Sequence, residues 1–547
     1  MTHAASSLPL PETHVPRGAL GRSRRGRIRA WVLVAVHVAA LVHIAHWRVA
    51  GKTLSPVEPS EARETLELGY VNAGFVLLIL ALLATLVLGR FFCGWACHVV
   101  AYQDAAAWLL ARLGLRPRAV RSRLLLLVPV LAACDLFLVP LLRRWTGDHP
   151  RTVVAAFVTD DLWATFPGAT IAALTFLVDG FLLVWFLGAK GFCTNACPYG
   201  ALFACADRAA PGRVRVTDAC EGCGHCTATC TSNVRVHEEV ARFGKVVDPG
   251  CMRCLDCVSV CPKDALYFGF RAKVTRAPAP LRGRSVAWDF TWPEELALAL
   301  LAVLGVLSFR GLYHAVPFML ALGLGVLFAV ASLVLLRLVT RRDLRFQHWC
   351  LRASGRLTRA GAVAAALSLA LVSLTLHSTV VRASTQLGLL RLERAQASAG
   401  SMRSEQLASA AAHLGRAQRL GLVVDAQVAH GLGSIDLAAG RYDRARRQLE
   451  RAIDAAPRLI APRLALAEGL LAQRDWAGAR DVLDALLALA PRDEHARWRR
   501  AQAAIGLRDF EQAEALLSAL VADAPRHAQA AADLERVRAV LGRDERD

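Results

Sequence analysis

The sequence predicts a polytopic α-helical membrane protein with a small cysteine-rich module inserted between spans and an all-α repeat array at its C-terminus. Three observations predict this arrangement. Long apolar runs recur along the first two thirds of the 547-residue chain. Eight of the fifteen cysteines crowd into two short segments near its middle. Past Arg382 the chain becomes rich in Ala, Leu and Arg and repeats with a period of 34 residues.

These features divide the chain into six segments. They are a basic tail (1–29), four transmembrane helices in two hairpins (30–190), the cysteine-rich region (191–270), a linker (271–293), three further transmembrane helices (294–382) and the repeat domain (383–547). A hydrophobic content of 55% is too high for an ordinary soluble protein, which agrees with a membrane location.

Seven apolar runs are candidates for crossing a bilayer, which takes about 20 residues. They are Ala30–Trp47, Leu68–Gly89, Leu124–Leu142, Pro167–Ala189, Leu296–Phe309, Val316–Leu336 and Gly361–Val381. The weakest of them is Leu296–Phe309, which is uncharged for only 14 residues.

The net charge of +20 does not indicate nucleic acid, because the basic residues gather in alternate loops. Six precede the first span, six lie between spans two and three, and seven between spans six and seven, whereas the outer loops hold three, three and one. Basic loops stay in the cytoplasm. We therefore expect a bacterial inner-membrane protein with its N-terminus and cysteine-rich region in the cytoplasm and its repeat domain in the periplasm.

The cysteine-rich region contains CEGCGHCTATC at 220–230 and CMRCLDCVSVCP at 251–262. Each run is C-x2-C-x2-C-x3-C, the ligand spacing of a bacterial ferredoxin with two [4Fe–4S] clusters, in which the fourth cysteine of each run serves the other cluster. Zinc knuckles or disulfides are the alternative, but zinc sites use paired C-x2-C units. The predicted ligands are Cys220, Cys223, Cys226 and Cys261 for cluster 1, and Cys251, Cys254, Cys257 and Cys230 for cluster 2. This region predicts an electron carrier.

Spans two and four end alike, in LGRFFCGWACH at 88–98 and GAKGFCTNACP at 188–198. Each hairpin thus carries a C-x3-C pair behind a basic residue at the cytoplasmic membrane edge. The four thiols are Cys93, Cys97, Cys193 and Cys197. Because the hairpins repeat, these thiols can converge to bind a further metal or cluster, or form redox-active disulfides. The alternative is that they are reduced thiols that pack the hairpin feet.

Two carboxylates, Asp135 and Asp179, are predicted near the middle of spans three and four. A carboxylate is costly there and marks a functional site by default. One hypothesis is that the two face each other at similar depth and form a route for protons released by a quinol. The alternative is a protonated or hydrogen-bonded pair that holds two helices together.

Together these residues resemble the NapH/NosR/CcoG class of membrane-bound polyferredoxins over roughly residues 30–270. The resemblance implies a protein that relays electrons between quinol or a cytoplasmic donor and a partner redox enzyme. The alternative is a maturation factor that reduces a metal or thiol during assembly of a respiratory metalloenzyme, and a third hypothesis is an assembly scaffold. His98 departs from the class, which often has proline there.

The C-terminal tail has columns of similar residues 34 apart, the period of tetratricopeptide repeats. The columns are Tyr442, Trp476 and Phe510; Ala445, Ala479 and Ala513; Leu449, Leu483 and Leu517; and Pro457, Pro491 and Pro525. We expect a tetratricopeptide solenoid over about 420–543, whose concave face recruits a periplasmic redox partner or client protein. A solvated spacer is the alternative.

Overall fold

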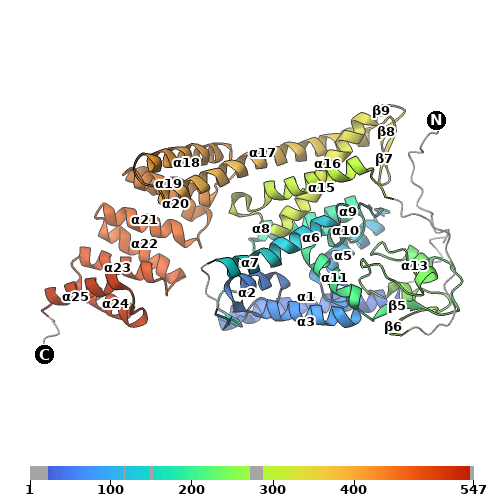
Figure 1. Cartoon of the computed structure of the whole chain (residues 1–547), viewed down its shortest axis with the longest axis horizontal. Helices are drawn as coiled ribbons and strands as arrows, with labels where there is room; N and C mark the ends of the chain where they lie inside the picture. The colour runs from blue at the N-terminus through green and yellow to red at the C-terminus, as the bar shows by residue number, and fades with distance from the viewer. Residues whose placement is uncertain (1–22, 116, 148–151, 164–165, 272–287, 543–547) are drawn as a thin grey trace. The chain divides into compact units, whose positions relative to one another are not determined.

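The computed structural model of the chain describes residues 23–115, 117–147, 152–163, 166–271 and 288–542. Most of the predicted basic tail and linker lies outside these residues. The chain divides into two compact units (Figure 1). The first comprises Met1–Arg310 and Pro317–Thr375, and the second comprises Gly311–Val316 and Leu376–Asp547.

Seven apolar helical segments correspond in position to the predicted spans. They are α1 (Arg24–Ala50), α3 (Ala73–Leu88), α6–η3–α7 (Leu127–Ala133, Cys134–Leu138, Val139–Thr146), α8–η4–α9 (Ala169–Thr175, Phe176–Leu182, Leu183–Leu187), α15 (Trp292–Phe309), α16 (Phe318–Thr340) and α17 (Arg359–Gln396). Among the described residues, five helices are long and apolar enough to cross a membrane, namely α1, α8–η4–α9, α15, α16 and α17. The weakest predicted span falls within α15. The number of spans and their sidedness remain predictions.

The helix ends follow from capping residues in the sequence. The Ser23 hydroxyl accepts the Gly26 N–H at 2.8 Å to begin α1, and the Asn72 side chain accepts the Phe75 N–H at 2.9 Å to begin α3. A capping box formed by Thr291 and Glu294 begins α15. The second predicted span therefore begins at Ala73 rather than Leu68, where the separate helix α2 (Ala62–Leu68) ends.

Two spans are interrupted by π-helical turns, η3 and η4, and each turn carries one of the two predicted intramembrane aspartates. Asp135 lies in η3 and Asp179 in η4. Such turns are rare and are found frequently at functional sites. They add one residue to a helical turn, so they alter the direction in which the aspartates point.

Helices α15 and α16 form a close hairpin because glycines line their contact. A Cβ at Gly305 would lie 2.7 Å from Gly325 Cα, and a Cβ at Gly325 would lie 2.7 Å from Ala302 O. Small residues at a crossing let helix backbones approach, which is how helices commonly associate in lipid.

The two hairpin feet have the same local structure. After α3 the chain forms a short helix, α4 (Phe91–Trp95), and then α5 (His98–Arg112). After α9 it forms α10 (Gly191–Asn195) and then α11 (Pro198–Ala209). Both pairs break at a cysteine, which caps the longer helix in each copy.

At the other ends of these spans, short strands join two loops. Strand β1 (Thr53–Leu54) pairs antiparallel with β4 (Val158–Thr159), and β2 (Tyr70–Val71) pairs parallel with β3 (Val154–Ala155). The 3₁₀ turn η2 (Pro59–Glu61) leads from β1 into α2. The connection between the first two predicted spans is therefore folded.

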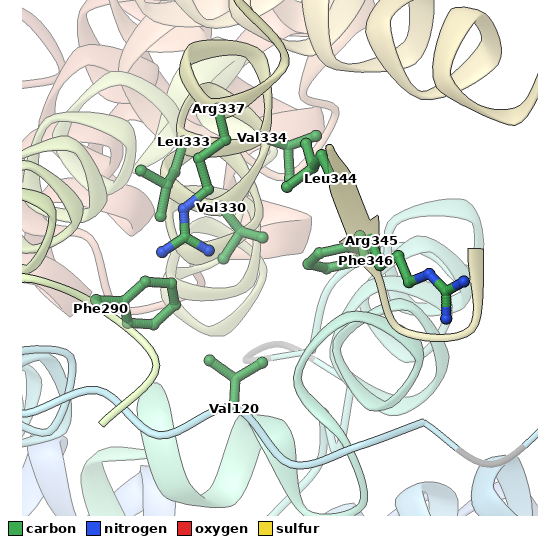
Figure 2. Close-up of a pocket in the computed structure, with 9 residues that line it drawn as sticks. All are labelled: Val120, Phe290, Val330, Leu333, Val334, Arg337, Leu344, Arg345 and Phe346. Atoms are coloured by element: carbon green, nitrogen blue, oxygen red, sulfur yellow. The ribbon is translucent and has the colours of Figure 1, made fainter. Parts of the chain in front are cut away.

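A three-stranded sheet separates α16 from α17. Its strands, β7 (Leu344–Phe346), β8 (Trp349–Ala353) and β9 (Arg356–Leu357), are antiparallel. Figure 2 shows a small apolar cavity of about 30 Å³ between this sheet, α16 and Val120.

The cysteine-rich region folds as a compact module. Strand β5 (Arg213–Val216) pairs antiparallel with β6 (Leu266–Gly269), in the register Arg213 to Gly269. Between them lie α12 (His225–Ala228), α13 (Val236–Phe243) and α14 (Asp256–Ser259). The core beneath the two cysteine loops is built from apolar side chains: Val214, Val234, Val236, Val240, Val246, Leu255 and Leu266.

The second unit contains the predicted tetratricopeptide array. Its helices are α18 (Gly400–Leu420), α19 (Ala426–Ala438), α20 (Tyr442–Ala455), α21 (Ile460–Ala472), α22 (Trp476–Leu489), α23 (Glu494–Gly506), α24 (Phe510–Asp523) and α25 (Ala528–Val540). The alanine and leucine columns of the repeat are fully buried, and each proline of the repeat follows the end of α20, α22 or α24. The unit also includes the turn η5 (Leu312–His314).

Candidate metal centre

The two cysteine loops of the module have the same backbone course. Gly222 (φ 70°) and Gly224 (φ 77°) adopt left-handed conformations in the first loop, and Arg253 (φ 53°) and Leu255 (φ 63°) do so at the equivalent positions of the second. Left-handed residues turn the chain sharply, which is how three closely spaced cysteines can face one point. Glycine adopts this conformation freely, whereas Arg253 and Leu255 need tertiary support.

The thiols of the second loop form one group with Cys230. Burial raises the pKa of the Cys257 thiol, and Cys254, Cys251 and Cys230 raise it further as neighbouring sulfurs. Burial likewise raises the pKa of Cys230 to about 12, with Cys251 as the largest charged neighbour. These are the four cysteines predicted to hold cluster 2.

The thiols of the first loop form a second, more exposed group. Burial raises the pKa of Cys226 to about 11, and Cys220 and Cys223 add to it. Cys220 and Cys223 are themselves exposed. The fourth predicted ligand, Cys261, has a sulfur that accepts the Ala265 N–H at 3.3 Å.

The four thiols of the C-x3-C pairs converge. Burial raises the pKa of Cys197 well above its ordinary value, and Cys193, Cys97 and Cys93 raise it further. Burial, then Cys93 and Cys193, raises the pKa of Cys97 to about 12. Helices α4 and α10 supply Cys93 and Cys193, while Cys97 and Cys197 cap α5 and α11. We call this set the four-thiol group.

Buried polar side chains surround the four-thiol group. Gln103 Nε2 donates to Cys193 Sγ at 3.0 Å, and Arg90 Nη2 lies 3.9 Å from Cys93 Sγ. Lys190 is 1% exposed and pairs with Asp104. Burial raises the pKa of Cys193 to about 11, although Lys190, Arg90 and Gln103 favour its thiolate. The surroundings therefore suit a site that carries negative charge.

The second loop packs directly against the foot that carries Cys93. Trp95 Nε1 donates to Arg253 O at 3.0 Å, and Arg90 Nη1 donates to Pro249 O at 2.9 Å. A Cβ at Gly94 would lie 2.2 Å from Met252 O, so only glycine permits this approach. Met252 shares a buried cluster with Cys93 and Cys193. The second loop thus lies next to the four-thiol group.

A buried ionic network holds this contact. Asp207 accepts from Arg253 Nη2 at 2.8 Å, from Arg213 Nη1 at 3.2 Å and from the Arg90 backbone N–H at 3.1 Å. Asp207 is 1% exposed and Arg253 is fully buried. Buried charged side chains need several such partners, because the free energy lost when a charge leaves water exceeds the free energy gained from one contact with an opposite charge.

A second network ties the N-terminal helix to the same region. Arg29 of α1 pairs with Asp104 at 2.6 Å and with Asp256 of α14 at 3.4 Å. Asp256 lies between the cluster 2 cysteines Cys254 and Cys257. The positive charge of Arg29 therefore lies close to the second loop.

The donor sets fit iron–sulfur clusters chemically. Soft thiolate ligands select such clusters, and thiolates buried together need compensating positive charge. In the described part of the chain, no three Cys, His, Asp or Glu side chains lie close enough to hold a single ion. A [4Fe–4S] cube, in which each iron binds a different thiolate, takes its ligands further apart than one ion does.

Comparisons with known families agree with these sites. Residues 72–116 and 169–217, which contain the C-x3-C pairs, match a 4Fe-4S binding domain, and residues 219–266 match a 4Fe-4S dicluster domain. Residues 436–497 and 470–536 match tetratricopeptide repeats. The methylamine utilization ferredoxin-type protein MauN of Methylorubrum extorquens is 34% identical over 182 residues, which is 32% of this chain and 60% of MauN. Ferredoxin-type protein NapH of Haemophilus influenzae is 28% identical over 210 residues, covering 37% of this chain and 68% of NapH.

The chain thus combines 4Fe-4S domains with C-terminal tetratricopeptide repeats, and this polyferredoxin is similar to NapH and MauN in the part that carries the cysteines.

The relatives resemble only part of the polyferredoxin. The match spans 48% of MauN from Methylobacillus flagellatus and 60% of the Methylorubrum protein. Among solved structures, YrrB, described as a TPR protein with an unusual peptide-binding site, covers 26% of this chain at 20% identity with a TM-score of 0.24.

The two aspartates that are predicted to lie within spans have different surroundings. Asp135 Oδ1 accepts from Arg310 Nη1 at 2.7 Å. Asp179 is 5% exposed, its Oδ1 has no partner among the described residues, and it lies where a Cβ at Gly323 would meet it. The two carboxylates thus have different surroundings, and a proton route that joins them stays a prediction.

Several residues around the polyferredoxin's sites were not predicted from the sequence. Gln103, Asp207 and Arg253 are the clearest examples. The sequence gives little indication of their roles, because a single charged or amide side chain on a helix or loop is usually solvated. Only the fold shows that these three are buried against the cysteine-bearing segments.

Proposed function

We propose that this polyferredoxin relays single electrons between the membrane and a soluble redox partner through three sites in series. The sites are the four-thiol group, the second cysteine loop with Cys230, and the first cysteine loop with Cys261. A [4Fe–4S] cluster, when bound, takes up or releases one electron at a potential set by hydrogen bonds, charge and exposure. Iron–sulfur electron transfer in respiratory systems is also what the ferredoxin-type relatives suggest.

The contact between α4 and the second loop carries this proposal. Met252, which follows the cluster 2 cysteine Cys251, shares a buried cluster with Cys93 of α4, and Gly94 of α4 lies against the Met252 carbonyl. An electron carrier that used only the ferredoxin module would not need buried thiols at this place. The order of the three sites follows from this adjacency.

The first loop is the port for a soluble partner. Cys220 and Cys223 are exposed, whereas Cys257 of the second loop is buried. Electron transfer between proteins needs close approach of the two sites, so the exposed loop is the one that a partner can reach. The tetratricopeptide array supplies a separate protein-binding surface, whose client we propose to be a periplasmic redox partner.

On the membrane side we propose quinol as the source of electrons, whereas a cytoplasmic donor would enter at the exposed first loop. Asp179 is the stronger candidate for accepting a proton, because its buried Oδ1 has no hydrogen-bond partner in the part of the chain that the structure describes. The charge of Asp135 is already balanced by Arg310.

The test is anaerobic mixing of the full-length protein in nanodiscs with a reduced quinol analogue, followed by EPR. We expect reduced-cluster signals to appear rapidly. In a Cys93→Ser, Cys193→Ser variant they should appear at least about tenfold more slowly, while dithionite still reduces the ferredoxin clusters. Cys205→Ser is the matched control, because Cys205 is exposed on α11 and lies in none of the three sites.

A four-thiol variant reduced by quinol at the normal rate would overturn the serial order. Clusters that ignore quinol and respond only to a low-potential cytoplasmic donor would favour the maturation role, in which the same thiols reduce a metal or thiol of another enzyme.

A further inference from the structure

The loop between α18 and α19, which we call the 420–424 loop, is an exposed apolar segment. Its sequence, Leu-Gly-Leu-Val-Val, contains no polar side chain. Leu422 is 69% exposed and Val423 is 59% exposed. Elsewhere in the described repeat helices, large exposed apolar residues occur singly, as at Leu489, Leu507 and Val540. A contiguous exposed apolar segment marks an interaction site.

The 420–424 loop is attached to the turn at 311–316. The Leu422 N–H donates to Tyr313 Oη at 2.9 Å, and a Cβ at Gly421 would lie 3.5 Å from Tyr313 Cε1. Both segments belong to the second unit, so this contact lies within one compact body.

The turn itself is fixed in an unfavourable conformation. Gly311, Tyr313 and His314 all have positive φ angles, of 65°, 55° and 54°. Arg382 Nη1 donates to Gly311 O at 3.4 Å, and the Gly311 N–H donates to Val316 O at 3.0 Å. Non-glycine residues persist in this conformation only where their surroundings hold them. The Tyr313 side chain is therefore a fixed anchor.

The chain connectivity places this turn at a membrane surface. Helix α15 ends at Phe309 and α16 begins at Phe318, and both are candidate spans. A connection this short between two spans emerges at the bilayer interface whichever side it faces. The 420–424 loop, which is hydrogen-bonded to the turn, must lie at the same interface.

We propose that the 420–424 loop is a membrane-contact element that inserts Leu422 and Val423 into the boundary between lipid headgroups and acyl chains. Apolar side chains are more stable at this boundary than in water, because their apolar surface is removed from water there. Tyr313 has the amphipathic ring that is enriched at this depth. Arg416 and Arg419 on α18 are exposed beside the loop, where guanidinium groups can meet lipid phosphates. The repeat array would then be held against the bilayer by this loop as well as by α17.

A peptide is the competing occupant. A cavity of about 190 Å³ is lined by the loop itself, including Leu422 and Val423, together with polar residues such as Gln418, Asp425 and Arg451. Its mixed lining could accept a hydrated peptide, whereas the exposed apolar surface of Leu422 and Val423 suits lipid. The experiment distinguishes the two.

The test replaces Leu422 by the photoreactive residue p-benzoylphenylalanine in the full-length protein, in phosphatidylcholine nanodiscs. Val540 on α25 is the control position, because it is 63% exposed and lies in the last described helix of the array. After illumination, mass spectrometry counts lipid adducts. We expect at least about tenfold more at position 422 than at 540. Equal yields at the two positions, or adducts at 422 that join two polypeptides, would overturn the proposal.

A second variant tests the anchor. Tyr313→Phe removes only the oxygen that accepts the Leu422 N–H. We expect the lipid-adduct yield at 422 to fall severalfold while thermal unfolding of the repeat array is unchanged. An unchanged yield would show that Tyr313 does not hold the loop at the interface.

Discussion

The two cysteine loops of the ferredoxin module share their spacing and backbone turns but not their surroundings. The first loop uses Gly222 and Gly224 where the second uses Arg253 and Leu255. The first exposes two of its cysteines, and the second packs against α4. This difference shows that the spacing of the cysteines specifies a cluster site locally. The position of that site in an electron relay depends instead on the segments that the site contacts.

The largest expected effect is a difference in electron transfer between a variant that lacks one ligand of the second loop and a variant that lacks one ligand of the first. In Cys257→Ser, the module should lose about half of its iron, and quinol should no longer reduce the remaining cluster, because the middle site is gone. In Cys223→Ser, iron should also fall by about half, yet the remaining cluster should still be reduced. Iron analysis and EPR measure both. Equal electron transfer in the two variants would break the serial order.

Substitution of Arg253, the buried arginine of the second loop, should destabilise the module more than substitution of any charged residue of the first loop. Arg253→Ala leaves Asp207 buried with Arg213 as its remaining charged partner. Removing one member of a buried ion pair lowers the free energy of unfolding by about 3–5 kcal/mol. Because Arg213 still pairs with Asp207, we expect a loss of about 3 kcal/mol. Denaturant unfolding of the module, followed by cluster absorbance, measures it.

Lys263→Ala is the control for that experiment, because the Lys263–Glu221 pair is exposed beside the first loop. We expect no measurable change in unfolding. A loss in this control as large as in Arg253→Ala would mean that burial does not distinguish the loops.

Chelation should remove iron from the first loop before the second. Mild oxidation followed by an iron chelator should strip the exposed site about tenfold faster, because the buried site requires local opening of the contact with α4. Time-resolved EPR, with Cys223→Ser and Cys257→Ser as single-site references, assigns each phase. Simultaneous loss would show that the packing against α4 does not protect the second site.

The smallest expected effect concerns backbone strain in the first loop. Gly222→Ala places a Cβ in open space, so its only cost is the left-handed conformation, about 1 kcal/mol. The unfolding midpoint should shift slightly, with iron content and EPR signals unchanged. A larger loss would indicate that the first loop is more tightly packed than its exposure suggests.

Much of the fold could be read from local patterns. The apolar runs located the helices, including the weak run in α15, and the 34-residue period located the buried alanine and leucine columns of the array. The interrupted spans could not be predicted, because π-helical turns at Asp135 and Asp179 depend on packing. The partner of Asp135 could not be predicted for the same reason, since it is Arg310, which is 175 residues away in the sequence.

The sequence by itself determined the cluster type, the repeat array and the duplicated hairpins, because each depends on spacing along the chain. Only the tertiary structure decided that the four C-x3-C thiols form one group and that the second cysteine loop rather than the first lies against it. It also decided that the 420–424 loop is hydrogen-bonded to a turn between two candidate spans. These are contacts between segments far apart in the chain, set by burial and by the close approach that Gly94 permits.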